Sequence, residues 1–285
     1  MPHANTCNDR LDPVSASLGA HSTASSATSL EQISRFAAET GLTRREAEIT
    51  LLERGIVPER YGRNIGTLGI DGQLAFRRAT AVVVGCGGLG GWLAEGLCRL
   101  GIGRLRLIDG DVFQGSNLNR QLGCTEHTLG HPKASALAEH LRGVNGAVDI
   151  EPLDMHLTET NARHLLDGAS VVLDALDSIY ARIVLQRAAR HCSLPLIHGA
   201  IAGWTGQVMT ILPDDPGLEA IYGDVPPQDH GVENETGTPT PTPMLVAAWM
   251  LQECAKLLSN RSMLLRGRLL ILDSLYGDAT AVDLG

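Results

Sequence analysis

The chain has 285 residues, of which 44% are hydrophobic, enough to fill the core of one large α/β domain or two small ones. Its net charge is −9 and the sequence has no basic stripe, which together argue against nucleic acid or an anionic membrane as a partner. No apolar run approaches the roughly 18–20 residues of a membrane-spanning helix, and the N-terminus lacks the pattern of a signal peptide, so we expect a cytoplasmic protein.

Residues 1–28 are rich in Ser, Ala and Thr and poor in large apolar side chains, so we predict a disordered tail. Residues 29–57 show helical periodicity and form, by our prediction, a small N-terminal helical appendage. Thr43 and Glu46 have the spacing of a capping box, which indicates that the second helix of this appendage begins there.

From residue 58 to residue 285, apolar strands alternate with amphipathic helices. Strands are expected at 80–84, 104–109, 148–151, 170–174, 196–198, 206–212, 268–272 and 280–284, and helices at 89–100, 132–144, 160–168, 179–191 and 244–258. Near-continuous apolar strands separated by helices are typical of a mostly parallel sheet covered on both faces. We therefore predict a Rossmann-like α/β domain that is extended by a C-terminal antiparallel part.

Residues 213–243 interrupt this alternation and hold seven of the 13 prolines. An irregular stretch of this length in a compact domain is typical of a functional or a disordered loop. Thr242 and Pro243 predict the N-cap and the first residue of the helix that follows.

The segment 85–90, Gly-Cys-Gly-Gly-Leu-Gly, follows an apolar strand and opens a helix, and Asp109 ends the next strand. This unit predicts a nucleotide site, because glycines let the backbone approach phosphate and the carboxylate can bind ribose hydroxyls. The alternative is a glycine turn that only packs helix on strand.

A nicotinamide dehydrogenase would be the default interpretation of this unit. Three features favour a triphosphate instead: the glycine density of residues 85–91, the polar stretch 116–121, and Lys133 at a helix start. A cation at that position opposes the helix dipole unless an anion is bound beside it. Lys133 is one of only two lysines, the other being Lys256.

Several sequence blocks occur in order between about Pro58 and the C-terminus: residues 60–64 (RYGRN), 85–90 (GCGGLG), 109–111 (DGD), 116–121 (SNLNRQ), 130–133 (GHPK), 174–178 (DALDS) and 199–207 (GAIAGWTGQ). In these blocks the chain resembles the E1-like (ubiquitin-activating) superfamily, specifically the bacterial adenylyltransferases of the ThiF, MoeB and HesA type. This resemblance implies that residues 58–285 form an adenylation domain whose crossover loop spans about 213–243.

The resemblance also implies roles for particular residues. Asp177 would hold Mg²⁺, Arg120 and Lys133 would stabilise charge as pyrophosphate leaves, and Arg63 would reach into the partner subunit's site of a homodimer. The residues implied to bind ATP are Gly85, Gly87, Gly88, Gly90, Asp109, Asn117, Arg120, Gln121 and Lys133.

The implied reaction is attack by a carrier protein's C-terminal glycine carboxylate on the α-phosphate of ATP, which gives an acyl-adenylate and pyrophosphate. The implied partner is a small ubiquitin-like sulfur carrier that ends in Gly-Gly. A carboxylate needs no general base, which agrees with the lack of an obvious catalytic histidine.

Some residues depart from the pattern of these relatives. None of the six cysteines forms a C-x-x-C pair, so no zinc is expected, and residues 213–243 contain no cysteine that could capture the carrier covalently. Ser178 follows Asp177 where many relatives have Asn, a form that also occurs in relatives that activate a tRNA-bound carboxylate. Adenylation of a peptide or an amino acid, a non-catalytic binding module and an NAD-dependent oxidoreductase stay open as alternatives.

Several residues leave their role open. Asp174 and Asp177 are three residues apart, which suggests one metal ligand and one structural cap. His198, at a strand end, is either a structural histidine or a ligand. Cys124 is a candidate reactive thiol, and Cys86 is either an activated thiol at a helix N-terminus or a small residue that fits a tight turn.

Overall fold

The computed structural model describes residues 27–223, 236–261 and 263–284. Most of the expected tail therefore lies outside the described residues, as does the middle of the expected crossover loop. Ala27 and Thr28, which we had assigned to the tail, instead form a short parallel strand with Val57 and Pro58. Within the described ranges no helix is both long and apolar enough to cross a membrane.

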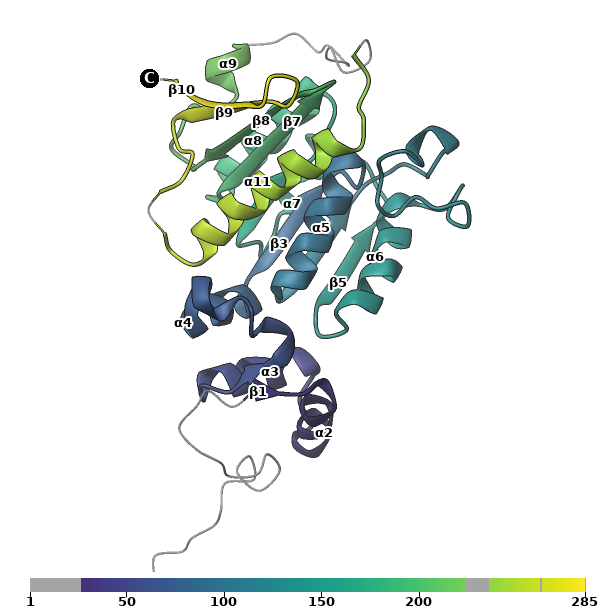
Figure 1. Ribbon diagram of the computed structural model, residues 1–285. Coiled ribbons are helices and arrows are strands. Elements are labelled where there is room, and N and C mark those ends of the chain that lie inside the picture. Colours follow the sequence, from purple (N-terminus) through teal and green to yellow (C-terminus); the bar gives the residue numbers. More distant parts are fainter. Residues whose placement is uncertain (1–26, 224–235, 262, 285) are drawn as a thin grey trace, which may run out of the picture.

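An eight-stranded mixed sheet forms the centre of the described structure, in the order β10-β9-β8-β7-β6-β3-β4-β5 (Figure 1). The strands are β3 (Thr80–Val84), β4 (Arg104–Ile108), β5 (Asp149–Leu153), β6 (Val171–Asp174), β7 (Leu196–Ala202), β8 (Thr205–Ile211), β9 (Arg268–Asp273) and β10 (Asp278–Asp283). β3 to β7 pair in parallel and β8 to β10 in antiparallel fashion. The predicted Rossmann-like sheet with an antiparallel extension is thus confirmed.

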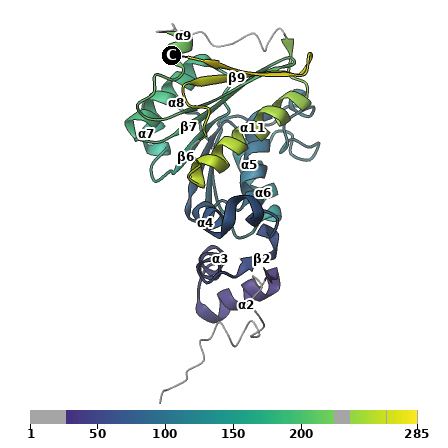
Figure 2. The ribbon, with the colours of Figure 1, turned by 60° about the vertical axis from the view of Figure 1, so that its left-hand side comes forward.

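Helices cover both faces of the parallel part (Figure 2). The helices of the sheet domain are α4 (Ile65–Arg78), α5 (Gly88–Leu100), α6 (Lys133–Val144), α7 (Ala162–Leu165), α8 (Ile179–His191), α9 (Glu219–Tyr222) and α11 (Pro241–Leu258), with a 3-10 turn η2 (Gly115–Asn117). β3 explains the two layers: Ala81 and Val83 join the apolar core under α5, α6 and α11, whereas Val82 and Val84 join the core under α7 and α8. A strand buried on both faces must be apolar at every position.

The long helix α11 begins earlier than predicted. Its N-cap is Thr240 and its first residue is Pro241, not Thr242 and Pro243. Both prolines fit the first turn, because the backbone N–H groups of that turn have no partner within the helix. The hydroxyl of Thr242 is instead buried and donates to the carbonyl of Gly203 at 2.7 Å.

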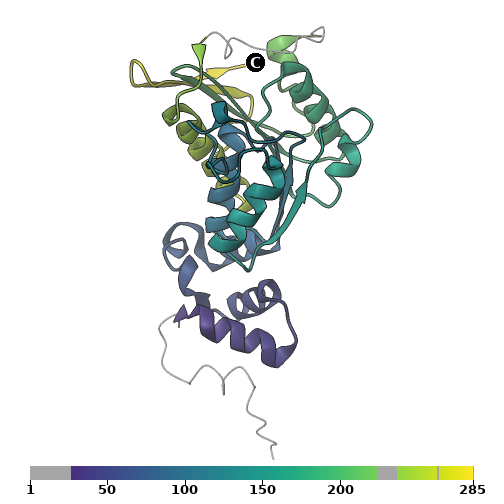
Figure 3. The same cartoon turned by 90° about the vertical axis from the view of Figure 1, so that its right-hand side faces the viewer.

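The N-terminal helices α2 (Leu30–Thr40) and α3 (Arg44–Glu53) lie below the sheet domain, at the end opposite the β9–β10 hairpin (Figures 1 and 3). Both begin in a capping box, at Ser29 and at Thr43, and the second was predicted. The strand β2 (Val57–Pro58) and the 3-10 turn η1 (Glu59–Tyr61) lead from α3 to α4.

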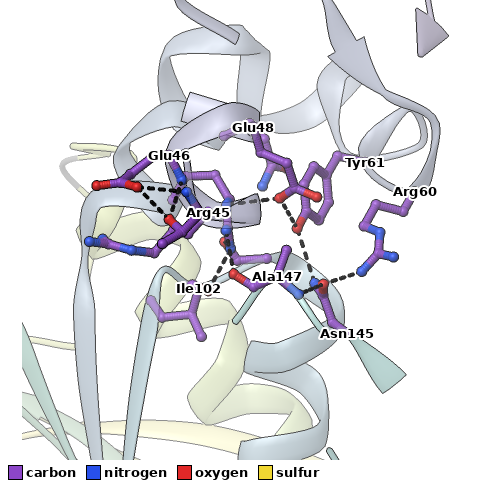
Figure 4. A network of polar contacts seen from close by, with 12 residues as sticks. Arg45, Glu46, Glu48, Arg60, Tyr61, Ile102, Asn145 and Ala147 are labelled. Carbon is purple, nitrogen blue, oxygen red and sulfur yellow. Dashed lines mark hydrogen bonds and ion pairs between the residues drawn. The ribbon is translucent and has the colours of Figure 1, made fainter. Parts of the chain in front are cut away.

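A buried polar network joins these helices to the sheet domain (Figure 4). Arg77 of α4 lies 3.1 Å from the carboxylate of Glu48 of α3, and both side chains are fully buried. The hydroxyl of Tyr61 donates to the same carboxylate and accepts from the amide of Asn145, each at 3.0 Å. Arg77 also donates to the carbonyls of residues 101, 102 and 147, so a single guanidinium holds three segments together.

Candidate active site

A pocket of about 410 Å³ lies at the carboxyl ends of β3, β4 and β6. The chain order of the strands reverses there, since β4 and β5 lie to one side of β3 and β6 and β7 to the other. Open α/β sheets bind ligands at such a switch point. Of the predicted site residues, the pocket wall contains Gly85, Gly87, Gly88, Asp109, Arg120, Gln121, Lys133 and Asp177.

The glycine loop between β3 and α5 forms the floor of this pocket. Gly85 has a φ of +93°, and a Cβ atom there would lie 2.5 Å from the carbonyl oxygen of Ala175. A Cβ atom on Gly90 would lie 1.7 Å from the carbonyl oxygen of Gly85. Gly90 therefore serves the close packing of helix on loop and does not itself line the pocket. The first intrahelical bond of α5 runs from the N–H of Gly91. The N–H groups of residues 88–90 have no partner among the described residues and can meet an anion.

Asp109 ties the end of β4 to the glycine loop. One carboxylate oxygen accepts the N–H of Cys86 at 2.7 Å and the other accepts the N–H of Asp111 at 2.8 Å. Burial raises the pKa of Asp109 above its usual value, and the two backbone bonds oppose that rise. A carboxylate offers about four acceptor positions, so two remain for ribose hydroxyls.

Lys133 opens α6 with its side chain nearly buried in the pocket wall. Its Nζ lies 2.8 Å from a carboxylate oxygen of Asp111, which itself is half exposed. The negative charge beside this lysine in the described structure is therefore a protein carboxylate, whereas the sequence predicts a bound anion there. The ammonium group faces the space where phosphates would lie.

Arg120 and Gln121 close the pocket opposite the glycine loop. A Cβ atom on Gly88 would contact the side chain of Arg120, and one on Gly87 would contact that of Gln121. The Oε1 atom of Gln121 is buried without a hydrogen-bond partner among the described residues, so it can accept a hydrogen bond from a ligand. Arg120 is held by the carbonyl of Ser116 at 3.0 Å.

Asp177 follows β6 and is exposed on the pocket wall, with no recorded partner in the described part of the chain. The described residues include no group of three or more His, Cys, Asp or Glu side chains that could hold a metal by itself. Magnesium typically takes one or two carboxylates and completes its shell with water and substrate phosphates. Asp177 fits that requirement. Asp174 does not, because its carboxylate is buried against His198.

Besides Gly90, two predicted site residues lie outside the pocket wall. Asn117 is buried in η2, where its Oδ1 accepts the N–H of Gln114 at 2.9 Å and thereby shapes the loop that carries Arg120. Arg63 is exposed between η1 and α4. Its neighbour Asn64 contacts Gln73, which donates to the carbonyl of Leu100 just before β4, so Arg63 lies at the amino ends of the strands, away from the pocket. Conversely, Arg182 and the segment Met155–Leu157 line the pocket and were not predicted. The strand β5 ends at the same edge as β3 and β4, which is the signal that could have indicated residues 155–157.

Neither cysteine singled out from the sequence is an activated thiol. Burial raises the pKa of Cys86 well above its usual value, with the Asp109 charge adding to the effect, and burial also raises the pKa of Cys124. At Cys86, desolvation therefore raises the thiol pKa by more than the helix N-terminus could lower it.

Residues 61–284 match the ThiF family over their whole length. The chain belongs to the ThiF family. Among curated relatives, the chain is 34% identical over 222 residues to the SAMP-activating enzyme E1 of Haloferax volcanii. The matched segment covers 76% of this chain and 82% of that protein. It is 33% identical over 206 residues to the sulfur carrier protein ThiS adenylyltransferase of Bacillus subtilis, covering 70% of this chain and 61% of that protein.

The fold is shared with solved structures of more distant proteins. The crystal structure of E. coli MccB with ATP superposes on 89% of this chain and 82% of its own with a TM-score of 0.68, at 19% identity. At that identity the likeness concerns the fold alone, and it agrees with an E1-like Rossmann architecture.

Proposed function

We propose that this ThiF-family chain is an ATP-dependent adenylyltransferase that activates the C-terminal glycine carboxylate of a small ubiquitin-like sulfur carrier ending in Gly-Gly. The observation that carries the proposal is the convergence of Arg120, Lys133 and Asp177 on one pocket above a glycine loop. The relatives named for activating SAMP and for adenylating ThiS support the choice of substrate. ATP and such a carrier meet in the cytoplasm, which is therefore the proposed compartment.

The pocket offers a separate group to each part of ATP. The free N–H groups at the start of α5 face the phosphates, and Lys133 and Arg120 add two positive charges. Asp109 would accept the ribose hydroxyls. Phosphoryl-type transfer depends mainly on such positioning and on electrostatic stabilisation.

Mg²⁺ is the proposed cofactor, and Asp177 is the residue that would hold it. When bound, the ion would shield the phosphate charge from the incoming carboxylate. Only one protein carboxylate is then needed, which agrees with the lack of partners of Asp177 among the described residues.

In the reaction, an oxygen of the carrier's terminal carboxylate attacks the α-phosphorus and forms the new P–O bond. The bond between the α-phosphorus and the bridging oxygen breaks, and pyrophosphate leaves with its electron pair. Lys133 and Arg120 stabilise the charge that develops on the phosphate oxygens. The attacking carboxylate is already ionised at neutral pH, so no residue has to remove a proton.

ATP–pyrophosphate exchange tests the proposal. We expect exchange only when a carrier ending in Gly-Gly is added, and none when its last glycine is deleted. Asp177→Ala should abolish exchange, whereas Asp167→Ala, at an exposed aspartate outside the pocket, should leave it unchanged. Exchange that depends on a free amino acid, a peptide or a tRNA would assign a different carboxylate, and reduction of NAD without exchange would overturn the proposal.

We further propose that Arg63 acts in the partner subunit of a homodimer. Its position at the amino ends of the strands, away from the pocket of its own chain, supports this arrangement. Mixing Arg63→Ala with Lys133→Ala subunits should restore part of the activity, because one site of each mixed dimer then has both residues intact. If the two inactive variants stay inactive after mixing and exchange of subunits, Arg63 does not act in the partner's site.

A further inference from the structure

A histidine and an aspartate form a fully buried pair behind the wall of the pocket. Asp174 ends β6, His198 lies opposite it on β7, and their side chains meet at 2.7 Å between Nδ1 and Oδ2. Burial lowers the pKa of His198, although the bond to Asp174 opposes that shift, so the neutral ring donates from Nδ1. Its Nε2 has no partner among the described residues. Apolar side chains would fill this space without leaving a buried nitrogen unsatisfied.

The second oxygen of Asp174 holds the loop that carries Asp177. Oδ1 accepts the N–H of Leu176 at 3.0 Å. The carbonyl of the same leucine accepts two bonds from the guanidinium of Arg182, from Nε at 3.0 Å and from Nη2 at 2.5 Å. Both backbone polar groups of the residue before Asp177 are therefore fixed by charged side chains.

The start of the loop is fixed as well. The N–H of Ala175 donates to the carbonyl of Val84 at 2.9 Å, and the carbonyl of Ala175 packs against the bare Cα of Gly85. Residues 175–177 are thus held by β3, by β7 through Asp174 and by α8 through Arg182. All three of these residues line the pocket, and Asp177 is the exposed one, whereas Ala175 and Leu176 are half-buried.

We propose that Asp174, His198 and Arg182 are positioning residues that hold Asp177 at the site of the nucleotide-bound metal. This inference rests on the proposed function. His198 occupies Oδ2 and so turns Oδ1 toward Leu176, while Arg182 fixes the other side of the same residue. Outer groups that orient a metal ligand change metal affinity by roughly 10- to 100-fold when they are removed.

The experiment compares the metal affinity of four variants with that of the wild type. Mn²⁺ binding is measured by electron paramagnetic resonance in the presence of a non-hydrolysable ATP analogue, which requires no turnover. We expect Arg182→Ala and His198→Leu to weaken Mn²⁺ binding about tenfold or more. His198→Asn should retain wild-type affinity, because its amide can replace the Nδ1 donor.

Arg190→Ala is the matched control. Arg190 lies on the same helix and also donates to loop carbonyls, those of Asp215 and Pro216, but it lies outside the pocket. The Arg190→Ala variant should be less stable than the wild type but bind Mn²⁺ with wild-type affinity. If His198→Leu does not fold, Arg182→Ala carries the test alone.

The Mg²⁺ concentration that gives half-maximal exchange, and not the maximal rate alone, should rise in the same two variants. Wild-type affinity in folded Arg182→Ala would overturn the positioning role and leave the proposed function intact. No exchange in the wild type with any carrier would instead overturn the proposed function.

Discussion

The Nζ of Lys133 lies 2.8 Å from the carboxylate of Asp111, and the backbone N–H of Lys133 donates to the backbone carbonyl of Asp111 at 2.9 Å. The first residue of α6 is thus joined twice to the loop after β4. This pairing holds a cation at a helix start, where the dipole alone would disfavour it. It also keeps the ammonium at the pocket wall.

Replacement of Lys133 by alanine should lower the rate of exchange by about 10²–10³-fold, because a charge aimed at the leaving phosphates is removed from a partly closed site. Lys256→Ala removes the other lysine, whose ammonium contacts Glu253 and the carbonyl of Met263 away from the pocket. That control should keep wild-type kcat. Steady-state exchange rates of both variants test this prediction. A fall of only about twofold in the Lys133→Ala rate would contradict the proposed role of Lys133.

The two glycines Gly90 and Gly143 should respond to alanine in opposite ways. A Cβ atom on Gly90 would lie 1.7 Å from the carbonyl of Gly85, so the glycine loop must shift and stability should fall by about 1–3 kcal/mol or more. Gly143, in α6, has nothing within 4 Å of such an atom, and alanine there should add about 0.5–1 kcal/mol. Denaturant unfolding measures both changes in the free energy of unfolding. If alanine stabilises at both positions, the close packing of Gly90 against the loop is contradicted.

Removal of the hydroxyl of Tyr61 tests the network of Figure 4. Tyr61→Phe leaves the buried Glu48 and Asn145 each without one partner, so the free energy of unfolding should fall by about 1–3 kcal/mol. Tyr180→Phe is the matched control: its hydroxyl also contacts a glutamate, Glu159, but on the surface. We expect a change within about 0.5 kcal/mol there. Similar values for both would show that the network adds no stability.

Glu219 should make stability depend on pH on the acid side. Hydrogen bonds from Arg187 and Arg190 hold the pKa of Glu219 below its usual value of 4.5. A lowered pKa in the folded state means that the unfolded chain binds the proton first, so this stabilisation is present above pH 4.5 and is lost as the pH falls below it. The stability difference between wild type and Glu219→Gln should shrink between pH 6 and acid pH, as followed by urea unfolding. A difference that grows on acidification would reverse the sign of the shift.

Alkylation should separate the cysteines by burial. Cys86, Cys98 and Cys254 are almost fully buried, and burial raises the pKa of the latter two to about 12. Cys192 is partly exposed. Iodoacetamide at pH 8, followed by peptide mass spectrometry, should label Cys192 well before those three, which should react only after unfolding. Rapid labelling of Cys86 in the folded protein would mean that its thiol is activated after all.

The sequence predicted the centre of the sheet because Ala81–Val84 of β3 and Val171–Leu173 of β6 are continuous apolar runs, a pattern that a strand buried on both faces requires. Of the pocket wall, the sequence predicted the glycine loop and Asp109 because they are local features, and the family resemblance added Arg120, Gln121, Lys133 and Asp177. Two other features could not be predicted from a residue pattern. The pairing of Lys133 with Asp111 depends on how two separate segments pack, and the bonds from Arg182 end on the backbone carbonyl of Leu176. An amide suits a ligand site and a turn equally well, so the sequence could not show that the side-chain oxygen of Asn117 accepts a backbone N–H within η2.

The two lysines have a chemical consequence for a protein that makes acyl-adenylates, which are reactive mixed anhydrides. An acyl-adenylate acylates free primary amines, whereas a guanidinium stays protonated and does not attack. Lys133 is paired with Asp111 and Lys256 with Glu253, and every other one of the 23 Lys and Arg residues is an arginine. An activated carrier therefore meets few nucleophiles through which it could become attached to the protein that activates it.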